Sequence, residues 1–317
     1  MKHIKRLGVV VMVVAIIMVI LSYLPKPKFE KDNPFRKSIQ TLVIAHSGGM
    51  KYPDNTLKNF EYAYEVGVDV LEMDVMLTQD NILVLLHGEN VTGNTRSHSN
   101  CDTVVWKETY DDLLNQCNFG YHFQDALGQY PYREMDALAW REAKVHLATL
   151  EEIFTQFGSN ILYNIEIKAD SDAPRIETAD ALYQLIKAFG LESHVLVATA
   201  FDDISQHLIQ NYPELYVSTS YGSAQDMIIA IYTFTSIFKT TPKYAAVQVP
   251  TSYQLPIINT LNLDTRHLIR TLNQHNMAMH YWTVNDEETM RYLIKQGADG
   301  IITDNIELLI SILNEGS

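Results

Sequence analysis

Short apolar runs rich in β-branched residues alternate with amphipathic helical stretches from about Thr41 to the end of the chain. This alternation predicts a parallel sheet joined by helical crossovers, because a parallel neighbour can be reached only through a long connection. The predicted strands are 42–46, 70–77, 82–87, 162–168, 195–200, 215–220, 244–249, 279–284 and 300–303. The predicted helices are 56–65, 150–157, 176–189, 204–212, 224–238, 264–274 and 287–295.

Nine runs are one too many for an eight-stranded barrel, and the spacing of the second and third resolves the count. Only residues 78–81 separate them, so the two must pair antiparallel as a hairpin. A two-residue turn at Asp80-Asn81 gives a register in which Asp74 faces His87. The third run then leaves the sheet, and we expect a TIM (β/α)8 barrel with these two residues above its carboxyl ends, where barrel active sites are built.

The chain divides into an apolar N-terminus, a polar stretch and one large body. Residues 7–24 contain no charge and follow three basic residues, which predicts an uncleaved transmembrane signal anchor over 1–24; a cleaved signal peptide is the alternative. Residues 25–40 are predicted as a linker, and 41–317 as the barrel, with an insertion at about 89–145 covering its mouth. Basic residues flank the apolar run on both sides, but the short basic tail favours a cell-membrane protein whose body is extracytoplasmic.

The formal net charge of −14 excludes nucleic acid as a partner, because nucleic-acid binding needs a basic surface. It also leaves contact with lipid to the anchor. Cys101 and Cys117 are the two cysteines of the chain. In an exported domain they can form a disulfide, and two free thiols are the alternative.

Carboxylates gather at the ends of two predicted strands. Glu72 and Asp74 project to one face of the second run, because side chains alternate along a strand. Glu166 lies on a neighbouring strand and shares its face with Asn164 and Lys168. A single strand-end glutamate is more often half of a structural ion pair, but three carboxylates together predict a site for one divalent cation, Mg²⁺ or Ca²⁺.

Two histidines, His46 and His87, end the first run and the hairpin. Beside a cation and Lys168 they are suited to proton transfer near neutral pH. A metal, a lysine and paired histidines together describe a phosphodiester-cleaving site.

An ordered set of motifs makes the chain after residue 40 resemble the glycerophosphodiester phosphodiesterase family. The motifs are His46-Ser47-Gly48, Asn55-Thr56, Glu72-Met73-Asp74, His87, Thr149-Leu150-Glu151-Glu152, Glu166-Ile167-Lys168, Trp282-Thr283-Val284-Asn285 and Asp299 to Asp304. The resemblance implies a barrel of the phospholipase-C-like phosphodiesterase type. It also implies that Glu72, Asp74 and Glu166 bind the cation, that His46 and His87 are the acid–base pair, and that Lys168 contacts the phosphate.

Two aromatic or basic residues on the predicted strand 279–284 have competing interpretations. Trp282 is predicted to be a wall of the substrate pocket, and a core position is the alternative. His280 shares its face, but a core histidine with satisfied hydrogen bonds is the favoured interpretation.

The chain departs from the family pattern beside both histidines. Ser47 stands where the family commonly has arginine, and Gly88 where it commonly has aspartate. Losing the guanidinium removes a bidentate phosphate ligand that serine cannot replace. We therefore expect an active enzyme with altered substrate preference, the alternative being a catalytically degenerate protein that only binds a phospho-ligand.

The expected reaction is hydrolysis of glycerophosphodiesters to an alcohol and glycerol 3-phosphate. The resemblance implies that a glycerol hydroxyl attacks phosphorus first and that water then opens a cyclic phosphate. We favour His46 as the acid and His87 as the base. The rival within the same chemistry is a lysophospholipase D acting on membrane lysolipids, which the anchor makes sterically plausible.

Overall fold

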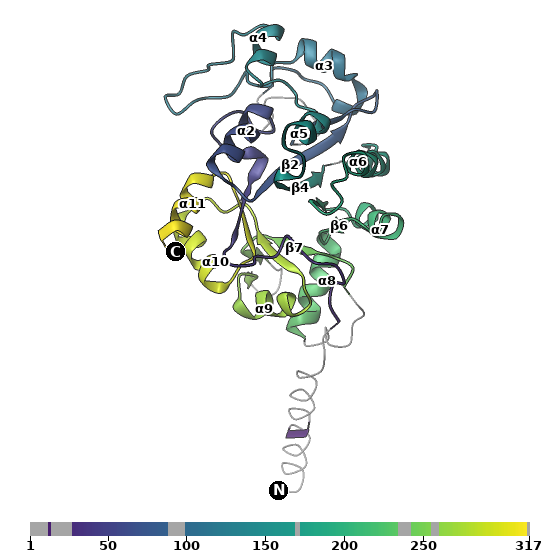
Figure 1. Ribbon diagram of the computed structural model, residues 1–317, viewed down its shortest axis with the longest axis vertical. Helices are drawn as coiled ribbons and strands as arrows, with labels where there is room; N and C mark the ends of the chain where they lie inside the picture. The colour runs from purple at the N-terminus through teal and green to yellow at the C-terminus, as the bar shows by residue number, and fades with distance from the viewer. Residues whose placement is uncertain are drawn as a thin grey trace.

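The computed structural model describes residues 12–13, 27–87, 99–168, 172–233, 242–254 and 260–315. Eight parallel strands form a nearly closed barrel in the order β6-β5-β4-β2-β1-β11-β10-β7, and helices surround it (Figure 1). The strands are β1 (Leu42–Ala45), β2 (Val70–Leu77), β4 (Leu162–Ile167), β5 (Val195–Ala198), β6 (Tyr216–Val217), β7 (Ala246–Val249), β10 (Ala278–Tyr281) and β11 (Gly300–Thr303). The predicted (β/α)8 barrel is confirmed.

The helices confirm the seven predicted crossovers, except that residues 234–238 of the predicted helix 224–238 lie outside the described residues, and one further helix follows the last strand. They are α2 (Leu57–Val66), α5 (Leu150–Phe157), α6 (Arg175–Phe189), α7 (Asp202–Asn211), α8 (Tyr221–Tyr232), α9 (Arg266–Gln274), α10 (Glu287–Gln296) and α11 (Ile306–Glu315). The last of these, and a small hairpin of β8 (Ser252–Gln254) and β9 (Thr260–Asn262), were not predicted. Side-chain caps fix several starts: Thr149 and Glu152, for example, form a reciprocal capping box at the start of α5.

Alternation along the strands separates two cores. Side chains such as Met73 and Ile165 face outward and pack with the helices in the main hydrophobic core. Side chains of the opposite parity, such as Ile44, Val70 and Ile302, fill the interior of the barrel. The residues that end the interior face of β2 and β4 are therefore aimed into the barrel at its carboxyl end.

The barrel closes at a short seam between β6 and β7. A single isolated bridge joins Ser218 to Ala246, supported by hydrogen bonds from Thr219 N–H to the Ala246 carbonyl and from Ala245 N–H to the Val217 carbonyl. This seam has fewer pairs than the six-residue register between β2 and β4. It is therefore the least extensively paired junction among the described strands.

The hairpin of β2 with β3 (Leu83–Leu85) is confirmed, but its predicted register was wrong by one residue. Val75 pairs with Leu85 and Leu77 with Leu83, so paired numbers sum to 160 and Asp74 lies opposite Leu86, not His87. The turn contains one more residue than predicted, because Asn81 adopts a left-handed conformation with φ of 63°. A three-residue loop ending in that conformation is a standard hairpin closure.

The insertion follows this hairpin and packs against it and against α2, whose Glu61 forms an ion pair with Lys144. Its short helices are α3 (Tyr110–Gln116) and α4 (Ala137–Glu142). Met76, Val84 and Leu86 of the hairpin form a hydrophobic cluster with Leu113, Cys117 and Phe119. Cys101 and Cys117 form a disulfide, which settles the choice between bridge and free thiols.

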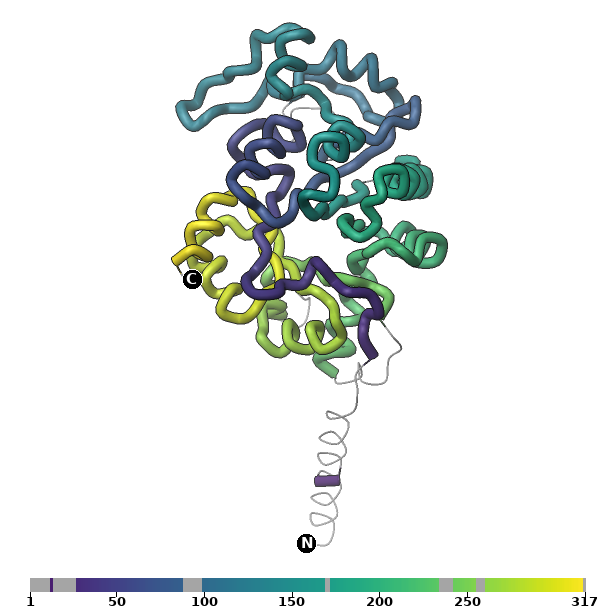
Figure 2. The backbone as a smooth tube through the Cα atoms, in the orientation of Figure 1, coloured from purple at the N-terminus to yellow at the C-terminus, as the bar shows by residue number. Residues whose placement is uncertain are grey.

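Residues 27–37, which were predicted as part of a linker, instead pack against the amino end of the barrel. We call residues 27–37 the strap, which is the dark purple segment that runs across the barrel before β1 in Figure 2. Phe29 and Phe35 are buried against Tyr216, Ala246 and Ala278. The strap is therefore part of the folded body and closes the barrel interior at its amino end.

The predicted anchor at 7–24 lies outside the described residues, apart from Met12 and Val13. None of the helices in the described parts of the chain is long and apolar enough to cross a bilayer.

Candidate active site

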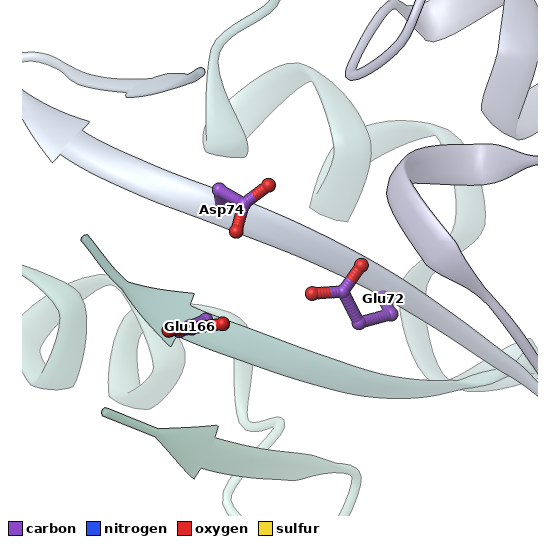
Figure 3. A group of neighbouring side chains, drawn as sticks. All are labelled: Glu72, Asp74 and Glu166. Atoms are coloured by element: carbon purple, nitrogen blue, oxygen red, sulfur yellow. The ribbon is translucent and has the colours of Figure 1, made fainter. Parts of the chain in front are cut away.

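Three carboxylates meet at the carboxyl end of the barrel. The register places Asp74 of β2 directly beside Glu166 of β4, and Glu72 lies two residues earlier on the same face. Ligand-type oxygens of the three lie within 4.8 Å of one another (Figure 3). Glu72 is 4% exposed and Asp74 is fully buried. The structure therefore brings together the three residues predicted to bind a cation.

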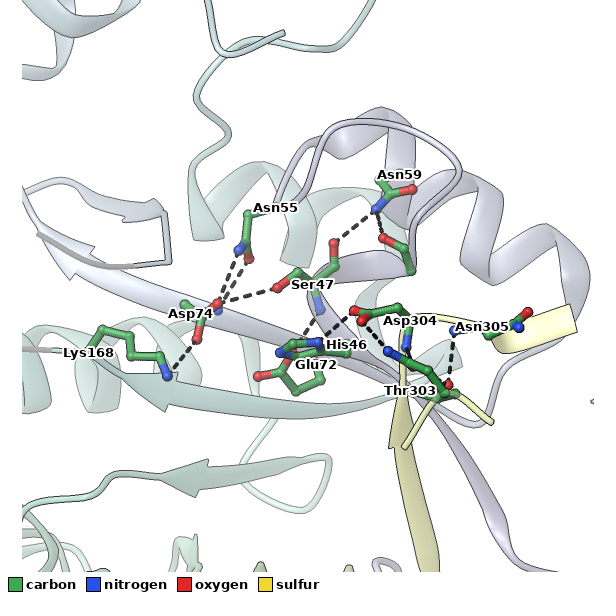
Figure 4. Close-up of polar contacts among 12 residues, drawn as sticks. His46, Ser47, Asn55, Asn59, Glu72, Asp74, Lys168, Thr303, Asp304 and Asn305 are labelled. Atoms are coloured by element: carbon green, nitrogen blue, oxygen red, sulfur yellow. Dashed lines mark hydrogen bonds and ion pairs between the residues drawn. The ribbon is translucent and has the colours of Figure 1, made fainter. Parts of the chain in front are cut away.

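Neighbouring groups hold one oxygen of Glu72 and one oxygen of Asp74. The Ser47 N–H donates to Glu72 Oε2 over 2.8 Å. Asn55 binds Asp74 twice: its Nδ2 donates to Asp74 Oδ2 over 3.1 Å, and its Oδ1 accepts from the Asp74 N–H over 3.2 Å (Figure 4). Hydrogen-bonded outer groups of this kind orient metal ligands. The sequence analysis included the motif Asn55-Thr56 but did not predict this role of Asn55.

The residues present fit a divalent cation. Asp74 Oδ1 is buried and accepts no hydrogen bond from the described residues, and its ion pair with Lys168 is as long as 3.5 Å. A bound ligand would complete the contacts of this oxygen. Burial, together with repulsion from Asp74, raises the pKa of Glu72 to about 8. Burial also raises the pKa of Glu166. Burial disfavours the ionised form of these carboxylates, and a bound Mg²⁺ or Ca²⁺ would stabilise that form.

Lys168 follows β4 and lies at the edge of the carboxylates. Its Nζ is 2.9 Å from Glu166 Oε2 and 3.5 Å from Asp74 Oδ1. Burial opposes the charge of this ammonium, but Asp74 and Glu166 more than offset burial and raise the pKa of Lys168. The lysine is therefore a fixed positive charge, with about a quarter of its side chain exposed toward the mouth.

His46 begins the turn after β1 and is held by a residue that sequence reasoning missed. Its Nδ1 lies 2.7 Å from Asp304 Oδ1, and Asp304 Oδ2 accepts from Asn285 Nδ2 over 2.7 Å (Figure 4). Because an ionised carboxylate can only accept, Nδ1 of His46 carries the proton in this hydrogen bond. Asn285 and Asp304 belong to the last two family motifs. The signal available in the sequence was the place of Asp304 directly after the last predicted strand.

The other candidate site residues are His87, Trp282 and His280. His87 is half-buried and comes one residue after Leu86, whose N–H donates to the Asp74 carbonyl over 3.0 Å. Trp282 follows β10 at the same end of the barrel and is 47% exposed, so it is not a core residue. His280 is fully buried, with Nε2 bound to the Phe35 carbonyl, as the core interpretation predicted.

Ser47, which replaces the common arginine, is fully buried in a tight turn. Its Oγ lies 3.4 Å from Asp74 Oδ2, and its carbonyl accepts from Asn59 Nδ2 over 3.0 Å. The serine thus supports the carboxylates rather than facing the mouth. Gly88, the second departure, lies outside the described residues.

Comparison with known proteins decides the family. Residues 46–308 match the model of the glycerophosphoryl diester phosphodiesterase family. The chain belongs to this family. The family confirms the predicted enzyme class, a glycerophosphodiester phosphodiesterase. The matched range includes both His46 and Asp304.

Relatives and solved structures of the phosphodiesterase agree with this assignment. A glycerophosphodiester phosphodiesterase of Caldanaerobacter subterraneus subsp. tengcongensis is 28% identical, covering 88% of this chain and all of the relative. A rat lysophospholipase D is 21% identical, with 86% of each chain covered. A structure of an Oleispira antarctica phosphodiesterase with the product sn-glycerol-3-phosphate superposes with a TM-score of 0.60 at 19% identity, covering 87% of this chain and 97% of that one.

Proposed function

We propose that the protein is a metal-dependent phosphodiesterase that hydrolyses glycerophosphodiesters to glycerol 3-phosphate and an alcohol. Glu72, Asp74 and Glu166 would hold one divalent cation, Mg²⁺ or Ca²⁺. When bound, the cation supplies positive charge that stabilises the charge developing on the phosphoryl oxygens. The observation that carries the proposal is the buried carboxylate cluster beside Lys168 and the His46–Asp304 pair.

The histidines would move the protons of the reaction. In the first step a glycerol hydroxyl attacks phosphorus, its proton passes to the base, and the bond from phosphorus to the alcohol oxygen breaks as the acid protonates that oxygen. Water then opens the cyclic phosphate with the two roles reversed. We assign His46 as the acid and His87 as the base. Asp304 stabilises protonated His46, which supports that assignment.

Lys168 and Trp282 would bind the substrate. The ammonium of Lys168 would contact a phosphate oxygen, because it is the fixed cation at the edge of the cluster. The exposed ring of Trp282 would form an apolar wall beside the glycerol. These contacts would orient the diester, and orientation alone supplies a large part of such a rate enhancement.

The test is an assay of glycerophosphocholine, glycerophosphoethanolamine and glycerophosphoglycerol with Mg²⁺ or Ca²⁺. We expect turnover that EDTA abolishes and that Glu166→Gln and His87→Ala each reduce by at least about 10²-fold. The matched control is Glu177→Gln, since Glu177 is an exposed glutamate on α6 and should leave turnover unchanged. Turnover that ignored EDTA and both site variants would refute the proposal.

A second candidate within the same chemistry is a lysophospholipase D, favoured by the similarity to the rat enzyme of that name. It predicts faster turnover of lysophosphatidylcholine than of glycerophosphocholine. The same assay, run with both substrates in detergent, separates the two.

We also propose that residues 1–24 anchor the protein in the cell membrane by a single pass, with the barrel on the extracytoplasmic side. The Cys101–Cys117 disulfide supports this side, because disulfides persist in oxidising compartments. Protease treatment of intact cells should degrade the barrel, whereas protection of the barrel until the cells are lysed would contradict the orientation.

A further inference from the structure

The strap fixes the start of the folded body at the amino end of the barrel. Its Lys31 Nζ donates to the carbonyls of Glu214 and Leu215, just before β6. Asn33 Nδ2 donates to the carbonyls of Ala245 and Asn276, just before β7 and β10. These contacts reach three strand beginnings and bind the strap to the closed end of the barrel, and the Pro27 carbonyl lies 2.6 Å from His275 Nδ1, just before β10.

The active site lies at the opposite end. Glu166 is near the end of β4, and Lys168 and Asp304 come after the ends of their strands. Because the strands are parallel, strand beginnings and strand ends form opposite faces of the barrel. A six-residue strand such as β4 is about 20 Å long, so the strap and the carboxylate cluster are separated by most of the barrel's height.

The tether between the proposed anchor and the strap is short. Two residues separate Leu24, the last residue of the apolar run, from Pro27. Three peptide steps span at most about 11 Å when fully extended. A body held this closely cannot turn over to present its far end to the bilayer.

The charges of the two ends point the same way. The strap carries four basic residues and two acidic ones in a chain whose net charge is −14. Residues 99–145 of the insertion carry four basic and eight acidic residues. An anionic membrane surface attracts the basic end and repels the acidic one.

We propose that the closed end of the barrel faces the lipid surface and that the catalytic mouth opens away from it. This inference rests on the proposed function and on the anchor. Its consequence concerns the substrate class: the enzyme takes water-soluble, deacylated glycerophosphodiesters that arrive from the aqueous side. Lysolipids held in the same bilayer do not reach the site, because their phosphate stays at the membrane surface.

The orientation can be measured without any assay of activity. A fluorescent side chain is introduced at position 39, next to the strap, or at position 127 in the insertion; Ile39 is 94% and Leu127 82% exposed, so both sites tolerate a label. The full chain is reconstituted in vesicles of phosphatidylcholine and phosphatidylglycerol that contain an energy-transfer acceptor on the headgroup. We expect at least threefold greater transfer from position 39 than from position 127.

A matched variant relaxes the tether. Inserting 30 glycine and serine residues between Leu24 and Pro25 adds a flexible span of about 30 Å. Transfer from position 127 should then rise toward that from position 39. Equal transfer from the two labels in the parent protein, or a protein that does not remain with the vesicles, would overturn the inference.

The activity arm separates this inference from the proposed function. With the parent protein in vesicles, dissolved glycerophosphocholine should be hydrolysed at least tenfold faster than lysophosphatidylcholine in the same bilayer. Comparable rates would overturn the orientation and leave the phosphodiesterase function intact. If neither substrate is hydrolysed even in detergent, the proposed function fails, whereas the energy-transfer result still reports the orientation.

Discussion

Asp304 holds His46 through a hydrogen bond of 2.7 Å to Nδ1, and Asn285 in turn holds the other oxygen of Asp304. The histidine therefore has a fixed tautomer and a stabilised protonated form before substrate arrives. A histidine and aspartate joined in this way lose much of their catalytic power when the carboxylate becomes an amide, although the geometry survives.

Asp304→Asn is expected to lower kcat by on the order of 10²–10⁴ with little change in KM. The matched control is Asp180→Asn, which breaks a His–Asp pair with His207 on the surface between α6 and α7. That control should keep full activity. Equal losses in the two variants would show that Asp304 acts through stability and not through His46.

Asn55 should set the affinity for the cation, because it holds both the backbone and one oxygen of Asp74. Asn55→Gly keeps the left-handed backbone at φ of 57° but removes the amide. Loss of an outer partner typically costs 10- to 100-fold in metal affinity, and we expect that range for Mg²⁺ or Ca²⁺ by calorimetric titration. Asn276→Gly is the control at the opposite end of the barrel, with φ of 58° and bonds to the strap. It should lower Tm without changing metal affinity.

The buried His280 should make stability fall in mild acid. Burial lowers its pKa from 6.5 to about 4, so the unfolded chain binds a proton that the folded protein does not accept. The contribution of neutral His280 to the free energy of unfolding is complete above pH 6.5 and is lost as the pH falls from 6.5 toward 4. The loss can reach on the order of 3 kcal/mol. Urea unfolding of His280→Gln should show a weaker dependence over this window than the parent; parallel curves would contradict the prediction.

The disulfide should stabilise the insertion. It closes a loop with a sequence separation of 16, and Cys117 packs in the cluster with Leu113 and Phe119. Replacing both cysteines by serine should cost about 3 kcal/mol in the unfolding of the unit that contains the loop. Limited proteolysis should then cut within 99–145 first. The parent treated with reductant should match the variant, and the variant itself should not respond to reductant.

The barrel and its carboxylates could be predicted because both follow from strand periodicity. Alternation alone placed Glu72 and Asp74 on one face and Glu166 on the same face of its own strand, and the register of β2 with β4 then joins them. The hairpin register could not be predicted as well. Whether Asn81 adopts a left-handed conformation decides between a two- and a three-residue loop, and the residue type permits both.

Other features depend on contacts between distant parts of the chain. Asp304 is 258 residues from His46, and nothing local marks it as that histidine's partner. The strap contains too few apolar residues for a periodic pattern, so its burial of Phe29 and Phe35 under β6, β7 and β10 is visible only in the structure. The helix α11 was not predicted, although its apolar residues have helical spacing.

The strap has a further consequence for how the barrel opens. Lys31 binds the carbonyls before β6, whereas Asn33 binds the carbonyl of Ala245, on the other side of the seam. One short segment therefore binds both edges of the seam, which in the described parts of the chain are joined by the Ser218–Ala246 bridge and its neighbouring hydrogen bonds. In a chain that begins at residue 41, amide hydrogens of β6 and β7 should exchange with solvent before those of β2 and β4. The barrel would open first along the seam between β6 and β7, which the strap crosses.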